Sequence, residues 1–205
     1  MEKKHQTKSL VLKRGLDYAS QHGYESLSFG WLAKDLGMSK SGLFGHFGSK
    51  EQLQIGVFDL GASQFVDFVM QPAIRKPRGL PRIRALADNW VRWNSDICGG
   101  GCPIITATVE VESKPGILRD HVYKLQREWI KGLEYAGQLA VSVGDFHPSS
   151  NPKQFAFELY SYMLGFHLYR KTMKDPGAEG IYRNGWELLL ARFRDGTHVG
   201  DVHVT

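Results

Sequence analysis

The chain has 205 residues, of which 42% are hydrophobic and 23% charged, proportions typical of a globular protein. It contains no stretch of 18 uncharged apolar residues, and its N-terminal sequence Met-Glu-Lys-Lys-His lacks the apolar run of a signal peptide. These absences argue against a membrane-spanning or secreted protein, so we expect a cytoplasmic one. The net charge is +5, and residues 1–51 carry +3 of it, with eight Lys and Arg against five Asp and Glu. An excess of this size permits nucleic-acid binding without requiring it.

Hydrophobic residues at helical spacing define the first predicted elements. Leu12, Leu16 and Ala19 recur at i, i+4 and i+7, which predicts an amphipathic helix that Gly23 ends. Three later serines occupy favourable N-cap positions and predict the starts of three further helices: Ser28, Ser39 and Ser49. Residues 71–81 contain three prolines and a glycine, so we predict that they form the loop that ends the fourth helix.

The rest of the chain also shows helical rather than strand spacing. We predict helices over about residues 81–97, 103–112, 116–143, 152–173 and 180–195. Residues 98–103 and 145–152 are predicted breaks, and residues 196–205 a polar tail. The predicted fold class is therefore all-α.

Residues 28–47 have the pattern of a helix-turn-helix. Ala33 provides the small residue that two crossing helices require, and Gly37 permits a tight turn between them. Five apolar residues are expected to face inward: Leu32, Leu36, Met38, Leu43 and Phe47. The outward positions of the second helix are small and polar: Ser39, Lys40, Ser41 and Gly42. Because a helix enters the major groove with a slim, hydrogen-bonding face, the pattern indicates DNA binding. A helical hairpin inside any all-α protein is the alternative.

The chain resembles the N-terminal signature of TetR-family transcriptional regulators over about residues 8–58, without gaps. The matching residues are Gly23-Tyr24-Glu25, Leu32-Ala33, Gly37-Met38-Ser39-Lys40-Ser41-Gly42-Leu43-Phe44, His46-Phe47 and Ser49-Lys50-Glu51. The resemblance implies an N-terminal helix-turn-helix DNA-binding domain over residues 1–55 and a helical effector-binding and dimerisation domain over residues 56–205. It also implies a homodimer that binds a pseudo-palindromic, double-stranded DNA operator.

The resemblance further implies which residues contact DNA. They are Ser28, Ser39, Lys40, Ser41, Gly42, Phe44, His46 and Lys50. Lys40 lies where the family's recognition helix meets base edges and flanking phosphates, whereas His46 and Lys50 match positions that face the DNA backbone. Phe44 is a departure, because the family commonly has Tyr there, and Phe cannot donate a hydrogen bond to a phosphate. Trp31 has two alternative positions, against the sugar-phosphate backbone or packed on the first helix.

The predicted helix over residues 152–173 carries apolar residues on two sides. One stripe comprises Phe155, Leu159, Tyr162, Phe166 and Tyr169. The other comprises Ala156, Tyr160, Met163, Leu164 and Leu168. Since both sides of such a helix must be covered, one side can face a partner subunit in a two-fold symmetric four-helix interface with the apolar final helix. An entirely intramolecular core is the alternative.

A small apolar or planar aromatic effector is expected, because the candidate pocket residues are mostly of those kinds. They are Trp90, Trp93, Cys102, Thr106, Trp129, Tyr162, Met163, Phe166 and His167. For each of them, ordinary core packing is the alternative. The leading hypothesis is a ligand-responsive repressor that such an effector releases from its operator.

Cys98 and Cys102 leave a second hypothesis open, a redox- or metal-responsive regulator. Three glycines between them make the segment flexible enough for a disulfide, although no second Cys/His pair nearby would complete a metal site. No catalytic constellation and no phosphate loop is present, so the sequence predicts no enzyme activity, cofactor or metal. The basic run from Arg75 to Arg84 is interpreted as a solvated face.

Overall fold

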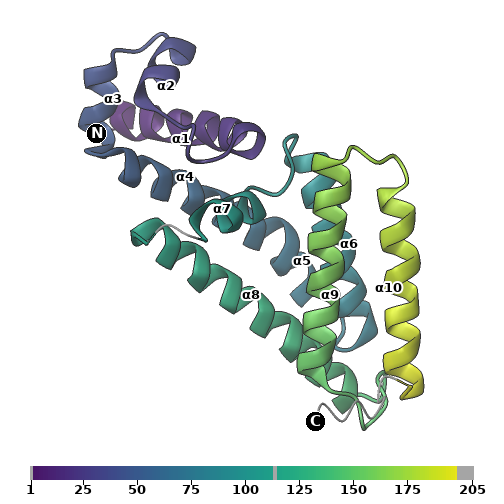
Figure 1. Cartoon of the computed structure of the whole chain (residues 1–205). Coiled ribbons are helices and arrows are strands. Elements are labelled where there is room, and N and C mark those ends of the chain that lie inside the picture. Colours follow the sequence, from purple (N-terminus) through teal and green to yellow (C-terminus); the bar gives the residue numbers. More distant parts are fainter. Residues whose placement is uncertain (1, 113–114, 198–205) are drawn as a thin grey trace. The chain divides into compact units, whose positions relative to one another are not determined.

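The structure is a computed structural model that describes residues 2–112 and 115–197. Every regular element within these ranges is a helix, as the sequence predicts (Figure 1). None of the helices described is both long and apolar enough to cross a lipid bilayer. The chain divides into two compact units, Met1–Phe68 with Arg92–Gln126 and Val69–Val91 with Arg127–Thr205.

The first unit begins with four helices, α1 (Glu2–His22), α2 (Phe29–Leu36), α3 (Lys40–Phe47) and α4 (Lys50–Phe65). All three predicted serine caps form. The hydroxyl oxygens of Ser28, Ser39 and Ser49 each accept a hydrogen bond, at 3.1 to 3.2 Å, from the backbone N–H three residues later. Each cap satisfies a donor that the first turn of a helix leaves unpaired. The starts of α2, α3 and α4 are therefore set by local sequence.

Apolar side chains from these helices form the core of the helix-turn-helix. Leu32 and Leu43 are fully buried, and Ala33 lies in the core beside them. The other residues predicted to face inward, Leu36, Met38 and Phe47, are only partly buried. Two helices of eight residues offer too little surface to enclose all five side chains. Leu43 is the buried residue of α3, and its burial fixes which side of the helix meets the core.

The first unit is completed by the π-helical turn η2 (Trp93–Ile97), α7 (Pro103–Val111) and the beginning of α8 (Ile117–Ser142). Helix α7 packs against both α1 and α4. The glycine-rich segment before α7 approaches α1 closely: a Cβ built on Gly100 would lie 2.3 Å from the carbonyl carbon of Ser20. A side chain at this position would collide with backbone, which explains one glycine of the triplet in steric terms.

The second unit contains α5 (Gln71–Ile74), α6 (Leu80–Arg92), the remainder of α8, α9 (Pro152–His167), η3 (Leu168–Thr172) and α10 (Ala178–Asp195). Helices α9 and α10 lie side by side and run antiparallel (green and yellow in Figure 1). Near one end their core is aromatic: Phe146, Phe155, Trp186 and Phe193 pack with ring centroids 5.0 to 6.4 Å apart.

The predicted loop over residues 71–81 is wrong in its first part. The π-helical turn η1 (Val66–Met70) continues α4 into α5, so the chain stays helical to Ile74. Pro72 does not break it, because it lies in the first turn of α5, where a missing N–H is tolerated. Helix α6 starts at Leu80, whose N–H donates to the Asp145 carboxylate at 2.8 Å. The division expected after residue 55 falls inside α4 and remains a prediction about function; most of the predicted tail lies outside the described residues.

Candidate nucleic-acid interface and ligand cavities

Helix α3 turns its polar residues to solvent. Lys40, Ser41 and Gly42 are exposed, whereas Leu43 on the opposite side is fully buried. The chain from residue 36 to residue 50 contains no Asp or Glu, so the formal charges of this segment are all positive. The result is a slim, positively charged helical surface with hydroxyl groups, which is what a DNA major groove and its phosphates require.

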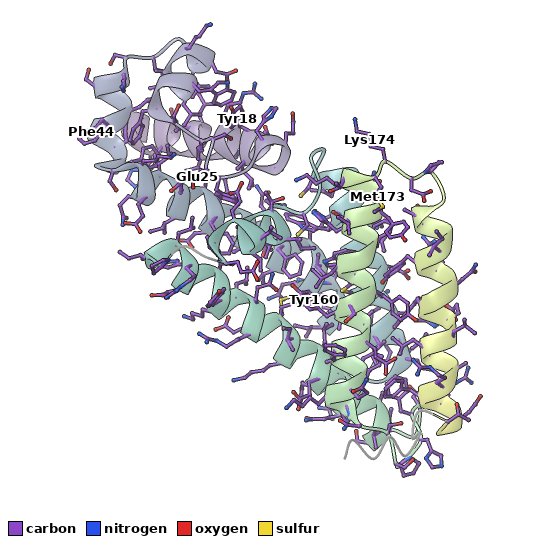
Figure 2. The ribbon with its side chains drawn as sticks, in the orientation of Figure 1. Tyr18, Glu25, Phe44, Tyr160, Met173 and Lys174 are labelled. Atoms are coloured by element: carbon purple, nitrogen blue, oxygen red, sulfur yellow. The ribbon has the colours of Figure 1, made fainter. Side chains whose placement is uncertain are left out.

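Phe44 lies on the exposed side of α3 (Figure 2). Its ring is 53% exposed and makes an edge contact with Phe29, with centroids 5.7 Å apart and planes at 67°. The contact holds the ring in place but leaves half of it in solvent. Such a ring can offer apolar contact to a thymine methyl group but no hydrogen bond to a phosphate.

Three other predicted contact residues are already engaged or partly covered. The Ser28 hydroxyl caps α2, although a hydroxyl that accepts one bond can still donate another. The Lys50 ammonium donates to the carbonyl oxygen of Glu25 at 2.6 Å, so it is directed at the turn after α1. The Nδ1 atom of His46 is buried, with no hydrogen-bond partner among the described residues.

Trp31 packs on the first helix, which was one of its two expected positions. Its ring centroid lies 3.7 Å from that of Tyr18, and the Arg14 guanidinium lies 5.5 Å above the indole. Arg14 is itself paired with Asp35 at 2.6 and 2.9 Å. This pairing lowers the pKa of Asp35, chiefly through the hydrogen bonds. The cluster ties α2 to α1.

The turn after α1 is held by side chains from two other helices. The Glu110 carboxylate of α7 accepts hydrogen bonds from the backbone N–H groups of Tyr24, at 2.7 Å, and Glu25, at 3.2 Å. The Gln54 amide of α4 donates to the Tyr24 carbonyl at 2.6 Å. Gly23 makes room for the carboxylate, since a Cβ there would lie 1.8 Å from a Glu110 oxygen. The start of the helix-turn-helix (Glu25 in Figure 2) is thus anchored to α7.

The residues expected to line one effector pocket belong to both units. Those in the first unit are Trp93, Cys102 and Thr106; those in the second are Trp90, Trp129, Tyr162, Met163, Phe166 and His167. Most serve the core of their unit. Trp90 packs on Phe166 and Tyr182 with centroids 5.9 and 6.5 Å away, and Trp93 packs on Phe65 and Phe68 at 5.9 and 6.2 Å.

Two hollows of the second unit include members of the predicted set. A groove of about 410 Å³ between α9 and α10 is lined by Tyr162 and Phe166, together with the exposed side chains of Phe157 and Ile181. A smaller, more apolar cavity of about 180 Å³ lies among η1, α5, α6 and α8 and is lined in part by Trp129.

The two cysteines are buried, and they are not joined in a disulfide. Burial raises the pKa of the Cys98 thiol, with a smaller contribution from Cys102. A buried thiol that stays protonated is a poor nucleophile and a poor metal ligand. Among the described residues no group of three His, Cys, Asp or Glu could hold a metal ion. These observations do not favour the redox or metal hypothesis.

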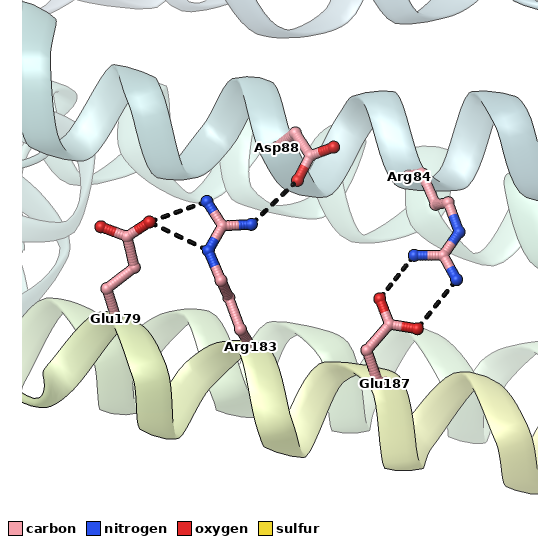
Figure 3. A network of polar contacts seen from close by, with 5 residues as sticks. All are labelled: Arg84, Asp88, Glu179, Arg183 and Glu187. Atoms are coloured by element: carbon pink, nitrogen blue, oxygen red, sulfur yellow. Dashed lines mark hydrogen bonds and ion pairs between the residues drawn. The ribbon is translucent and has the colours of Figure 1, made fainter.

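An exposed network of ion pairs joins α6 to α10 (Figure 3). Arg84 forms two hydrogen bonds to Glu187, at 2.5 and 2.8 Å, and Arg183 lies 3.8 Å from Asp88 and 2.7 Å from Glu179. The bonds from Arg84 lower the pKa of Glu187. Exposed pairs contribute little to stability, so we regard them as orienting α10 rather than holding it.

Two family profiles match these regions of the chain. The profile described as "Bacterial regulatory proteins, tetR family" matches residues 11–55, which include the helix-turn-helix. The profile described as "Tetracyclin repressor-like, C-terminal domain" matches residues 79–185, more than half of the chain. The chain belongs to the TetR family of transcriptional regulators. Membership confirms the predicted family and identifies a DNA-binding regulator rather than an enzyme.

Solved structures of other proteins, TetR-family regulators among them, have the same fold. One from Chloroflexus aurantiacus superposes with a TM-score of 0.83 at 21% identity, covering 94% of this chain and 96% of that one. AibR, solved with isovaleryl coenzyme A and operator DNA, gives 0.70 at 22% identity, covering 91% and 98%. A regulator from Saccharomonospora viridis, solved with choline, gives 0.79 at 14% identity, covering 90% and 96%. No curated protein sequence matches the chain.

Sequence reasoning missed part of the 180 Å³ cavity of this TetR-family regulator. Arg82 was assigned to a solvated face, but it lines the cavity. Trp129, Gly132, Ala136 and Leu139 line it from α8, at the i, i+3, i+7, i+10 spacing of one helix face. That spacing is visible in the sequence. The packing of this face of α8 against η1 and α6 is a tertiary feature, so the sequence alone does not show it.

Proposed function

We propose that this TetR-family regulator is a homodimeric repressor that binds a pseudo-palindromic operator through α3. A small apolar or aromatic effector releases it. The observation that carries the proposal is the exposed face of α3, which is slim, free of acidic residues and oriented by the buried Leu43. Lys40 supplies the positive charge on this face, and the serines beside it supply hydroxyl groups for bases or phosphates.

The other predicted contacts extend this surface. Phe44 replaces a hydrogen-bonding side chain by an apolar one, so we propose that it favours thymine at the base position it meets. Ser28 at the start of α2 can donate to a phosphate, and His46 lies near the end of α3. Lys50 reaches the DNA backbone only if it exchanges its bond to the Glu25 carbonyl for one to a phosphate.

The dimer is proposed to form through α9 and α10. Phe157, Ile181 and Leu188 expose 65%, 58% and 67% of their side chains there, beside the 410 Å³ groove. An exposed apolar surface of this kind marks an interaction site in a soluble protein. The same two helices of a second copy are the proposed occupant, because two antiparallel pairs related by a two-fold axis make a closed four-helix interface.

Release follows from the geometry of a two-fold dimer on DNA. Both α3 helices must meet major grooves about one helical turn apart. An effector that binds preferentially to a conformation with a different spacing of the two α3 helices weakens operator binding. The operator weakens effector binding by the same factor. The structural neighbours that hold isovaleryl coenzyme A and choline support a response to a ligand. Because these two ligands differ chemically, the class of effector is argued from the residues of this chain.

The DNA-binding part of the proposal is tested by repeated selection from a randomised DNA library. An enriched palindrome is expected, with an affinity that falls steeply with salt because bound phosphates release counterions. Lys40→Ala should lose or alter the palindrome, whereas Lys153→Ala, at another exposed lysine, on α9, should retain it. No enrichment with the unmodified protein overturns the proposal.

The dimer is tested by sedimentation equilibrium. Leu188→Glu places a charge in the proposed interface and should shift the protein toward monomer. Val109→Glu changes a side chain that is also 67% exposed, on α7 of the first unit, and should leave the mass unchanged. A monomeric unmodified protein at micromolar concentration contradicts the dimer.

A further inference from the structure

The smaller cavity of the second unit has a distinct chemical character. Its volume is about 180 Å³, and its apolar wall includes Met70, Leu86, Trp129 and Leu139, the last three of them buried. An apolar cavity of about 150 Å³ in another protein stays dry and takes up benzene. The cavity described here therefore has room for one aromatic ring or a short hydrocarbon chain.

One edge of the cavity is open and carries a fixed positive charge. Ile74 and Tyr135, which line it, are 51% and 57% exposed. Arg82 is the charged residue among the described residues that line the cavity. Its Nε and Nη2 atoms both donate to the Lys76 carbonyl, at 3.3 and 3.0 Å, which holds the guanidinium in position.

The chain around this edge adds to the positive charge. Residues 68–87 include five Lys and Arg and no Asp or Glu. Arg84 is paired with Glu187, but Arg75, Lys76 and Arg78 in the loop beside Ile74 are exposed. The carboxylate that approaches this loop, that of Asp145, is bound to the N–H of Leu80. A cation would find no free carboxylate among the residues lining the cavity.

We propose that this cavity binds a small carboxylate with an apolar body, an aryl- or alkyl-carboxylic acid of about six to eight carbon atoms by scaling from benzene. The body occupies the apolar interior and the carboxylate meets Arg82. A guanidinium is always charged and its planar fork matches a carboxylate, so a neutral analogue loses the anchor. This inference deepens the proposed function and rests on it only in giving the bound acid the role of effector.

Two substitutions separate the parts of the site. Gly132 lines the cavity, and a Cβ built there meets only the Met70 methyl carbon, at 3.9 Å. Gly132→Leu therefore fills the cavity without striking backbone. Arg82→Gln removes the charge and leaves the cavity. Arg78→Gln makes the same charge change in the exposed loop and serves as the matched control.

Binding is measured by isothermal titration of the full chain with phenylacetate, hexanoate and the neutral 2-phenylethanol. The acids should bind more tightly than the alcohol. Arg82→Gln should weaken acid binding by at least about tenfold and leave the alcohol unchanged, while Arg78→Gln stays within about twofold of the unmodified protein. Gly132→Leu should abolish binding of both acids and of the alcohol. Circular dichroism checks that this variant is folded. If Gly132→Leu does not fold, the comparison of Arg82→Gln with Arg78→Gln tests the inference.

Equal affinity for acid and alcohol, or undiminished binding to Gly132→Leu, overturns the inference. Adding phenylacetate to the protein–operator complex then tests separately whether the bound acid acts as effector. Weaker operator binding supports the acid as effector, and unchanged operator binding by the acid-bound protein overturns that role. If no acid binds while the selected palindrome is still bound, the carboxylate site is refuted and the proposed DNA-binding function stands.

Discussion

Removal of the Glu110 carboxylate should loosen the start of the helix-turn-helix from α7. Glu110 accepts hydrogen bonds from the Tyr24 and Glu25 N–H groups at 2.7 and 3.2 Å. A hydrogen bond to a charged group contributes about 1.5–3 kcal/mol when it is buried, and less where water can replace it. The Tyr24 bond is partly buried and the Glu25 bond is exposed. We therefore expect Glu110→Ala to lower the free energy of unfolding by about 1–2 kcal/mol.

A partner substitution tests the geometry behind this number. A Cβ on Gly23 would lie 1.8 Å from a Glu110 oxygen, and the backbone there has a φ of 85°. Gly23→Ala should thus displace the carboxylate and also strain the backbone. In a Glu110→Ala background only the backbone strain remains, and it should lower the free energy of unfolding by about 1 kcal/mol. The double variant should be less destabilised than the sum of the two single variants.

The assay is urea unfolding followed by circular dichroism, combined with amide hydrogen exchange. Glu110→Ala should speed exchange at Tyr24 and Glu25 specifically, and should weaken operator binding because the turn precedes α2. Glu128→Ala, on an exposed face of α8, is the matched control. If Glu110→Ala unfolds with the same free energy as the control and leaves Tyr24 protected, the anchoring role is refuted.

Three further predictions follow from local geometry. Ser39→Ala removes the acceptor of the Gly42 N–H and should cost about 1 kcal/mol of unfolding free energy in urea, with a loss of operator affinity; unchanged affinity would mean that DNA binding itself orders α3. Gly100→Ala should destabilise the fold by about 1–3 kcal/mol in the same assay, whereas Gly99→Ala, with open space around it, should be nearly neutral; equal effects would refute the close approach to Ser20. Burial, with smaller contributions from Lys171 and Arg170, lowers the pKa of His167 from 6.5 to about 4. The unfolded chain binds the proton first, so stability should fall by up to about 3 kcal/mol as pH drops from about 6.5 towards 4, and His167→Gln, compared by urea unfolding across this range, should flatten the loss.

The sequence was most informative where structure is decided locally. The serine caps and Gly37 set the helices around the turn, and each does so through bonds or angles within a few residues. The helix-turn-helix face of α3 follows from the same local pattern. The error at residues 71–81 has the opposite origin: Pro72 looks like a break in sequence, but a widened π-helical turn before it brings the proline into a first turn.

The effector-pocket candidates are divided between the two compact units, because residue type does not report position in the fold. Trp90 and Trp93 are three residues apart and alike in burial, yet they pack in different units. Arg82 was equally hard to place, since a basic run has the same composition whether it is fully solvated or lines a cavity. Which tryptophan or arginine meets a hollow depends on contacts between segments that are distant in sequence.

Neither compact unit is a continuous stretch of chain, because residues 69–91 leave the first unit before residues 92–126 return to it. On a ribosome the helix-turn-helix therefore emerges long before α7. The Gly100 contact with α1 and the Glu110 bonds to the turn after α1 form only after about fifty further residues have been made. Until then, the helix-turn-helix of the growing chain lacks the contacts that anchor it to α7. Operator binding by a chain that is still being synthesised is therefore disfavoured. A fragment that ends at residue 55 should resemble this incompletely anchored helix-turn-helix more than the helix-turn-helix of the complete fold.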